Sequence, residues 1–177
     1  MVFLLRLNAY FQKMKSLLLI RHAKSSWEHP QQNDFDRTLN ARGLKDAPAM
    51  AKKLVERNIQ IDAFLSSPAI RARQTCEHFM KAFGKDKAGM QLLSQLYLPE
   101  PSIFTATIEA LPAELQTVAI FSHNNGITEF ANQLTDAKID NMPTCCIFAV
   151  KIETADWSRF TKAKKTFWFV DYPKLIG

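Results

Sequence analysis

Short apolar runs that stop abruptly at polar residues are the clearest pattern along this chain of 177 residues. A continuous run of about four to eight apolar residues is typical of a strand that is buried on both faces of a sheet. One such run ends at Arg21 and His22, and a later one ends at Ser122 and His123. The pattern predicts strands over Ser16–Ile20, Ile61–Leu65, Thr117–Phe121, Cys145–Ile152 and Thr166–Tyr172.

Between these runs, apolar residues recur at the spacing of amphipathic helices. One helix is predicted over Ala41–Arg57, where Pro48 is tolerated if the helix begins only a few residues before it. A second helix is predicted to follow Ser67 as its cap, with Pro68 at its first position. The predicted helices after the first are Ala69–Phe83, Ser102–Leu111 and Gly126–Leu134, and an extended segment is predicted over Gln91–Leu98.

Strands and helices alternate along most of the chain, and this order predicts an α/β fold. The apolar character of the strands favours a mostly parallel central sheet with helices on both faces, a three-layer α/β/α sandwich. The last two strands are close in sequence and are expected to form an antiparallel edge. We expect a single domain over residues 14–177, and we interpret residues 1–13 as an extension, with the functional protein beginning near Met14.

Composition and net charge limit the classes of ligand and partner that we expect for this chain. Hydrophobic residues make up 47% and charged residues 23% of the chain, values typical of a soluble globular protein. The net charge of +6 favours an anionic ligand, but part of it comes from Lys162, Lys164 and Lys165, which we interpret as a solvated face. The chain has no repeat of basic residues with interleaved aromatic ones, so we expect no nucleic-acid partner.

The cysteines and the apolar segments indicate the compartment. The three cysteines have neither the paired spacing of a disulfide framework nor that of a metal site, which favours a reducing compartment. Adjacent Cys145 and Cys146 are expected to point to opposite faces of a strand. No apolar run is long enough to span a membrane. We therefore expect a cytoplasmic protein that does not bind membranes and needs no cofactor.

Candidate chemistry begins at Arg21 and His22, directly after the first predicted strand. Open α/β sheets bind ligands at the carboxyl ends of their strands. An imidazole is substantially unprotonated near neutral pH, so His22 can attack phosphorus without a strong base. The planar guanidinium of Arg21 can hold a phosphate through two hydrogen bonds.

Two further segments fit the same chemistry. Ser66–Thr75 follows a predicted strand and opens a helix, and the first turn of a helix favours anions. Arg71 lies in that turn, where a cation is unfavourable unless it serves an anion, so a phosphate is its expected ligand. His123 can donate a hydrogen bond to a phosphoryl oxygen, and the backbone N–H of Asn124 can join it.

Taken together, four segments resemble the histidine phosphatase superfamily, and within it the SixA-type phosphohistidine phosphatases. The matching segments are Leu19–Trp27, Asp36–Gly43, Ser66–Thr75 and Ser122–Asn124, in the order that the family shows. The resemblance implies a phosphoglycerate mutase-like fold. It also implies that the chain hydrolyses phosphate from a substrate without a metal ion.

The resemblance assigns roles to individual residues. It implies that His22 is the nucleophile and becomes phosphorylated, and that Arg21, Arg71 and His123 form the phosphate pocket. Ser25, Arg37 and Asn124 are expected as further phosphate or substrate contacts.

The sequence departs from the wider superfamily at two places. Ala23 replaces the glycine that usually follows the nucleophile, a change common among SixA-type members. Superfamily phosphomonoesterases usually carry a carboxylic proton donor between the two histidine segments, and Glu100 is the one candidate here. An alkoxide leaving group needs such an acid, whereas an imidazole can be protonated by solvent beforehand. The favoured substrate is therefore protein phosphohistidine, for example on a histidine phosphotransfer domain.

Two alternatives stay open. The chain can be a small-molecule phosphomonoesterase of the same superfamily that uses Glu100 as its acid. It can also be a phosphoprotein-binding module with little turnover, if the loop at Ala23 misplaces His22. The sequence does not indicate the oligomeric state.

Overall fold

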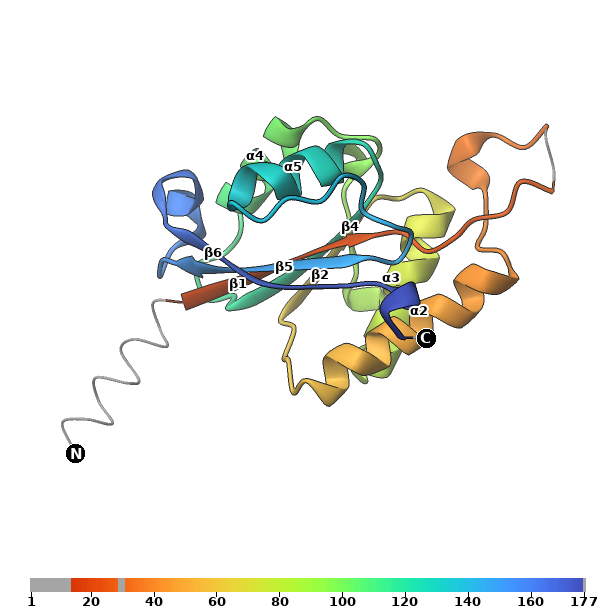
Figure 1. Cartoon of the computed structure of the whole chain (residues 1–177), viewed down its shortest axis with the longest axis horizontal. Coiled ribbons are helices and arrows are strands. Elements are labelled where there is room, and N and C mark those ends of the chain that lie inside the picture. The colour runs from red at the N-terminus through yellow and green to blue at the C-terminus, as the bar shows by residue number, and fades with distance from the viewer. Residues whose placement is uncertain (1–13, 29–30, 177) are drawn as a thin grey trace.

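A mixed six-stranded sheet forms the centre of the protein in a computed structural model that describes residues 14–28 and 31–176 (Figure 1). The expectations about residues 1–13 lie outside the described residues. Across the sheet the strands follow the order β3 (Gln91–Leu92), β2 (Ala63–Ser66), β4 (Thr117–Ser122), β1 (Met14–Arg21), β5 (Ile147–Glu153) and β6 (Lys165–Asp171).

The strand directions confirm the predicted mostly parallel sheet. β3, β2, β4 and β1 run parallel to one another, whereas β5 runs antiparallel to β1 and β6 runs antiparallel to β5. The two strands that are close in sequence therefore make the antiparallel edge, as predicted.

Helices cover both faces of the sheet, which confirms the three-layer architecture (Figure 1). α2 (Ala41–Glu56) and α3 (Ile70–Ala82) pack against one face. α4 (Pro101–Glu109) and α5 (Gly126–Leu134) pack against the other. Among the described residues, no helix has the length and apolar character that a membrane crossing requires.

Successive residues of β1 contribute to two separate apolar cores. Leu18 and Ile20 pack toward α2 and α3, whereas Leu17 and Leu19 pack toward α4 and α5. All four are fully buried, and burying each such side chain stabilises the fold by about 1.5–3 kcal/mol relative to exposure. Burial on both faces explains why this strand is continuously apolar rather than alternating.

The two adjacent cysteines lie on opposite sides of the sheet, as predicted. Cys145 belongs to the core with α2 and α3, and Cys146 to the core with α4 and α5. The predicted strand is wrong at its start, because β5 begins at Ile147 and Cys145 has a left-handed backbone with φ of 61°. The Cys145 N–H instead donates to the carbonyl oxygens of Arg21 and His22, each at 3.1 Å, and so anchors the end of β1.

Three local predictions need correction. α3 begins at Ile70 with Ala69 at its N-cap, so Ser67 does not cap the helix and Pro68 lies before it rather than at its first position. Pro48 lies in the interior of α2 rather than near its start. Within Gln91–Leu98 only the first two residues form a strand, and Ser94–Leu96 is a 3-10 helix.

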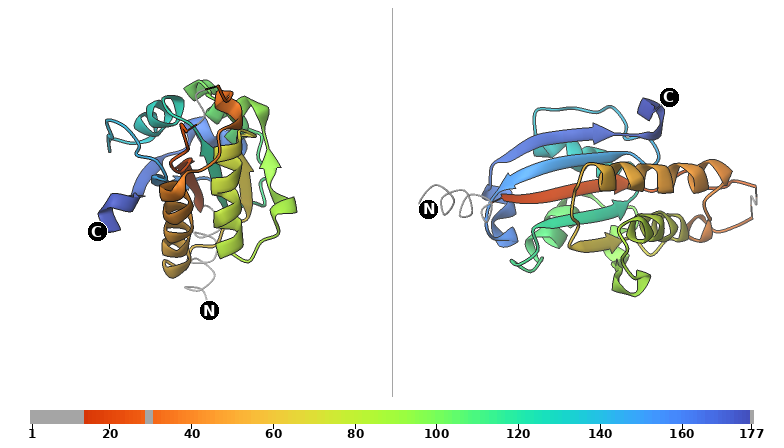
Figure 2. Two further views of the ribbon diagram at one scale, coloured as in Figure 1. Left: turned by 90° about the vertical axis from the view of Figure 1, so that its right-hand side faces the viewer. Right: turned by 90° about the horizontal axis from the view of Figure 1, so that it is seen from below.

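Parallel pairing aligns the carboxyl ends of three neighbouring strands at one edge of the sheet (Figure 2). Arg21 lies opposite Ser122 in the pairing of β1 with β4, and Ser66 lies opposite Phe121 in the pairing of β2 with β4. The residues that follow these strand ends therefore meet. They are His22, Ser67 and His123.

The start of α5 approaches the backbone before α4 so closely that only glycine fits. A Cβ atom on Gly126 would overlap the carbonyl oxygen of Pro99. A Cβ on Gly89 would meet nothing closer than Met80 Cε at 3.8 Å, an ordinary contact. The two glycines therefore differ in how much space they leave for a side chain.

Replacing Gly126 by alanine should destabilise the protein, because α5 and the Pro99 backbone must separate. We expect Gly126→Ala to lower the free energy of unfolding by about 1–3 kcal/mol. Gly89→Ala, the matched control, should change it by less than about 0.5 kcal/mol. Urea unfolding of the two variants measures both values, and equal stabilities would contradict the close approach.

Candidate active site

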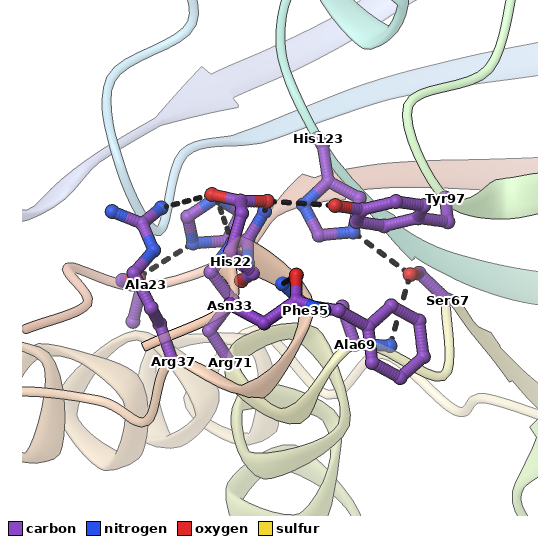
Figure 3. Close-up of polar contacts among 11 residues, drawn as sticks. His22, Ala23, Asn33, Phe35, Arg37, Ser67, Ala69, Arg71, Tyr97 and His123 are labelled. Carbon is purple, nitrogen blue, oxygen red and sulfur yellow. Dashed lines mark hydrogen bonds and ion pairs between the residues drawn. The ribbon is translucent and has the colours of Figure 1, made fainter. Parts of the chain in front are cut away.

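His22 follows β1 and is held by its own backbone. Its Nδ1 lies 2.7 Å from the carbonyl oxygen of Ala23, which can only accept, so Nδ1 carries the proton (Figure 3). Nε2 therefore keeps its lone pair. Burial, reinforced by the positive charge of nearby arginines, lowers the pKa of His22 to about 3. The imidazole is neutral at physiological pH and is suited to act as a nucleophile.

Arg71 joins the start of α3 to this histidine. It is almost fully buried in the first turn of the helix, and its Nε lies 3.3 Å from His22 Nε2. Thr75, one turn further on, accepts a hydrogen bond from the Ala23 N–H at 2.9 Å. Two residues of one helix face thus hold the loop that carries His22.

His123 lies beside His22 at the end of β4, with 5.0 Å between the ring centroids. Its Nε2 lies 2.8 Å from the hydroxyl oxygen of Ser67, which also accepts a hydrogen bond from the Ala69 N–H at 3.3 Å (Figure 3). The Ser67 hydroxyl can therefore donate to Nε2 and leave the His123 proton on Nδ1. Burial and the neighbouring His22 lower the pKa of His123 to about 2, so this ring is also neutral.

Several buried donors around the two histidines have no hydrogen-bond partner among the described residues. They are Nε of Arg21, Nε and Nη1 of Arg37, and Nδ1 of His123. All three residues line one cavity of about 330 Å³ that also contains His22 and Arg71. Unpartnered buried donors are rare and costly, so their convergence indicates a binding site for an anion.

Asp34, which no sequence pattern singled out, binds two arginines of this cavity. Its Oδ1 lies 2.9 Å from Arg37 Nη2, and its Oδ2 lies 2.8 Å from Arg71 Nη2. Tyr97 donates to the same Oδ2 at 2.8 Å, and Arg71 also binds the Asp34 backbone carbonyl. Burial alone would raise the pKa of Asp34, but the hydrogen bonds from Tyr97 and Arg71 outweigh it and lower the pKa. Asp34 is therefore an ionised counter-charge inside the cavity.

The spacing of Asp34 from Arg37 in the sequence could have indicated their ion pair. It precedes Arg37 by three residues on a 3-10 helix, Asp34–Asp36, which places its carboxylate beside that arginine. A carboxylate was expected only within residues 84–116, and Asp34 lies well before that stretch. The sequence predicted Ser67 as a helix cap, whereas in the structure its hydroxyl group contacts His123 Nε2.

The remaining predicted residues differ in their placement. Ser25, Arg37 and Asn124 line the cavity. The side-chain oxygen of Asn124 accepts a hydrogen bond from Thr128 at 2.8 Å, so this side chain is already engaged. Glu100 is exposed at the N-cap of α4 and is not among the residues that line the cavity. In the described part of the chain, no group of three His, Cys, Asp or Glu side chains could hold a metal ion.

Comparison with known proteins identifies the family. The model of the histidine phosphatase superfamily (branch 1) matches residues 17–96. An uncharacterised protein of Mycobacterium leprae is 32% identical over 126 residues, which cover 69% of this chain and 74% of that protein. The chain belongs to the histidine phosphatase superfamily. An uncharacterised chloroplastic protein of Arabidopsis thaliana is 29% identical over 140 residues, 74% of this chain, and the match spans only 63% of its length.

Solved structures in the superfamily share the whole fold. The SixA-type protein of Agrobacterium tumefaciens is 25% identical with a TM-score of 0.74, and the match covers 90% of this chain and 98% of that one. A protein histidine phosphatase SixA in complex with tungstate is 22% identical with a TM-score of 0.77, covering 92% of this chain and 99% of that one. The fold is therefore that of SixA-type members of the superfamily.

The buried histidines should make folding sensitive to acid. The unfolded chain protonates histidine near pH 6.5, whereas folded His22 has a pKa of about 3. The unfolded state therefore binds more protons between these values, and the free energy of unfolding must fall as the pH falls through this window. We expect His22→Asn to show a smaller fall than the parent chain. Urea unfolding at pH 7.5, 6 and 5 measures it, and parallel curves for the two proteins would contradict a neutral, buried His22.

Removing the Asp34 charge should strengthen anion binding, because its carboxylate occupies two arginines of the cavity. We expect Asp34→Asn to lower the dissociation constant for vanadate by about two- to fivefold, the effect of one partly exposed ion pair. Asp36→Asn is the matched control, since Asp36 lies on the same 3-10 helix but does not line the cavity. Calorimetric titration measures both, and weaker binding by Asp34→Asn would show instead that Asp34 holds the arginines in place.

Proposed function

We propose that this chain is a phosphatase that removes phosphate from protein phosphohistidine through a covalent phosphohistidine intermediate at His22. One observation carries the proposal. A neutral imidazole whose Nε2 carries no proton and lies 3.3 Å from Arg71 Nε faces a cavity lined by buried arginine and histidine donors that lack partners among the described residues. Membership of the histidine phosphatase superfamily supports phosphatase activity. The tungstate bound by a SixA phosphatase of the same fold supports a tetrahedral oxyanion as ligand.

In the first step, His22 Nε2 forms a bond to phosphorus while the bond from phosphorus to the substrate nitrogen breaks. The substrate ring, protonated by solvent on its other nitrogen beforehand, leaves as neutral imidazole. Phosphorylated His22 is a cation, and its Nδ1–H stays bound to the Ala23 carbonyl oxygen. Arg21, Arg71 and His123 stabilise the transferring phosphoryl group by donating to its oxygens.

In the second step, water attacks phosphorus and the bond to His22 Nε2 breaks. The electron pair returns to Nε2, a proton passes to solvent, and phosphate is released. The same donors serve both steps, because the phosphoryl oxygens stay beside them while water takes the place that the substrate nitrogen left. The proposed pathway involves no metal ion or cofactor.

The choice of substrate rests on proton supply. Asp34 is the only carboxylate that lines the cavity among the described residues, and its lowered pKa keeps it ionised. It therefore cannot donate a proton to a leaving group at neutral pH. Glu100, the acid of the phosphomonoesterase alternative, is exposed and outside the cavity lining. These placements favour a P–N bond, whose leaving imidazole needs no acid from the protein, over an alkyl ester.

The partner that fits this proposal is a phosphorylated protein, for example a histidine phosphotransfer domain. We also assign the chain to the cytoplasm, because Cys76, Cys145 and Cys146 are all buried and free, as expected in a reducing compartment. The binding-module alternative requires that His22 is misplaced. It differs from the proposal in one measurable respect, the formation of a phosphoenzyme.

Replacing the nucleophile should abolish turnover and labelling together. We expect His22→Asn to lower the rate of phosphohistidine hydrolysis by at least about a thousandfold. Brief incubation with radiolabelled substrate should trap an acid-labile, base-stable phosphoenzyme on the parent chain and none on the variant. Glu100→Gln is the matched control and should keep the parental rate, as should added EDTA. A chain that binds vanadate but never becomes labelled would support the binding module instead.

A further inference from the structure

Two large apolar side chains stand exposed at the opening of the phosphate cavity. Trp27 and Leu98 both line it, and they are 69% and 54% exposed, the highest values among large apolar residues in the described part of the chain. Single exposed apolar residues are common on protein surfaces. Here two of them line one cavity whose other lining residues are charged or polar, and exposed apolar side chains at the edge of a polar cavity are typical of a recognition surface.

Trp27 is held in place by the site itself. The guanidinium carbon of Arg37 lies 3.5 Å from the centre of the Trp27 ring. Arg37 is buried and paired with Asp34, so the ring rests on an immobilised support. Because the indole is held from the Arg37 side yet remains mostly exposed, it is a rigid aromatic anchor, and such anchors bind partners with little loss of conformational freedom.

Leu98 lies between two neighbours that are held in place. Tyr97 is tied to Asp34 through its hydroxyl group, and Pro99 is buried against Gly126. Between them, Leu98 has a left-handed backbone with φ of 48°, a conformation that branched apolar residues rarely adopt. Strained backbone of this kind concentrates at functional sites. The segment accepts the strain and presents an apolar side chain to solvent beside the cavity.

We propose that Trp27 and Leu98 form a recognition rim that binds the protein part of the substrate, an apolar segment adjoining the phosphorylated side chain. This rests on the proposed function. A cavity of about 330 Å³ can hold a phosphorylated side chain, and the rim then lies where the substrate chain continues. A small polar phosphate compound reaches the arginines but leaves the rim uncovered. The rim therefore selects proteins over metabolites without taking part in the chemistry.

The decisive comparison uses two substrates that both carry a P–N bond. One is a histidine phosphotransfer domain phosphorylated with phosphoramidate, and the other is free phosphoramidate. We expect Trp27→Ala and Leu98→Asn each to raise KM for the phosphorylated domain by about five- to tenfold, with kcat unchanged. Asparagine tolerates the left-handed backbone, so Leu98→Asn removes the apolar group without new strain. Both variants should hydrolyse phosphoramidate at the parental kcat/KM.

Control variants distinguish an effect of the rim side chains on the substrate from an indirect effect through Arg37. Leu92→Ala removes a similarly exposed leucine that does not line the cavity, and it should leave both substrates unaffected. Trp27→Phe keeps a flat ring on Arg37 and should restore most of the affinity for the domain. An equal loss on both substrates would overturn the proposal, because Trp27 would then act only by holding Arg37.

A binding measurement keeps this proposal distinct from the proposed function. In the His22→Asn background, titration with the phosphorylated domain reports affinity without turnover. Weaker binding on adding Trp27→Ala supports the rim even if the parent chain hydrolyses neither substrate, an outcome that would refute only the proposed function. Unchanged binding would overturn the rim.

Discussion

The parallel pairing of β1 with β4 is the constraint on which the rest of the site depends. It places Arg21 opposite Ser122, the last residues of the two strands, so the residue that follows each strand is a histidine and the two rings lie 5.0 Å apart. A slip of one residue would turn every β1 side chain to the other face of the sheet. The alternation of Leu17, Leu18 and Leu19 between two cores resists such a slip. The apolar packing of the sheet thereby fixes the geometry of a polar site.

That site concentrates positive charge in a partly buried space. Three arginines line one cavity, and burial would make so many unpaired charges costly. Two features reduce this cost. Both histidines are neutral, and Asp34 supplies a negative charge to Arg37 and Arg71. Enough donors stay unpartnered for an anion to complete the arrangement.

Continuous apolar strands that end at His22 and His123 were sufficient to predict the layers, the mostly parallel sheet and the meeting of the two histidines. Local pattern could not predict contacts between distant segments. The pairing of Asp34 with Arg71 and Tyr97 joins three separate parts of the chain, and the role of Ser67 depends on His123. The prediction of an extended segment up to Leu98 failed for a related reason. Leu98 has a left-handed φ, and its neighbours are bound to distant parts of the chain.

The long loop between β1 and α2 has a consequence for how such proteins diverge. It carries Ser25, Trp27, Asp34 and Arg37, all of which line the cavity, whereas His22, Arg71 and His123 adjoin strand ends or begin a helix. Loops tolerate insertion and substitution far better than the elements they connect. Mutations in this one loop can therefore alter the edge of the cavity while His22, Arg71 and His123 are inherited unchanged. Related chains can acquire new substrates by drift in a single surface segment.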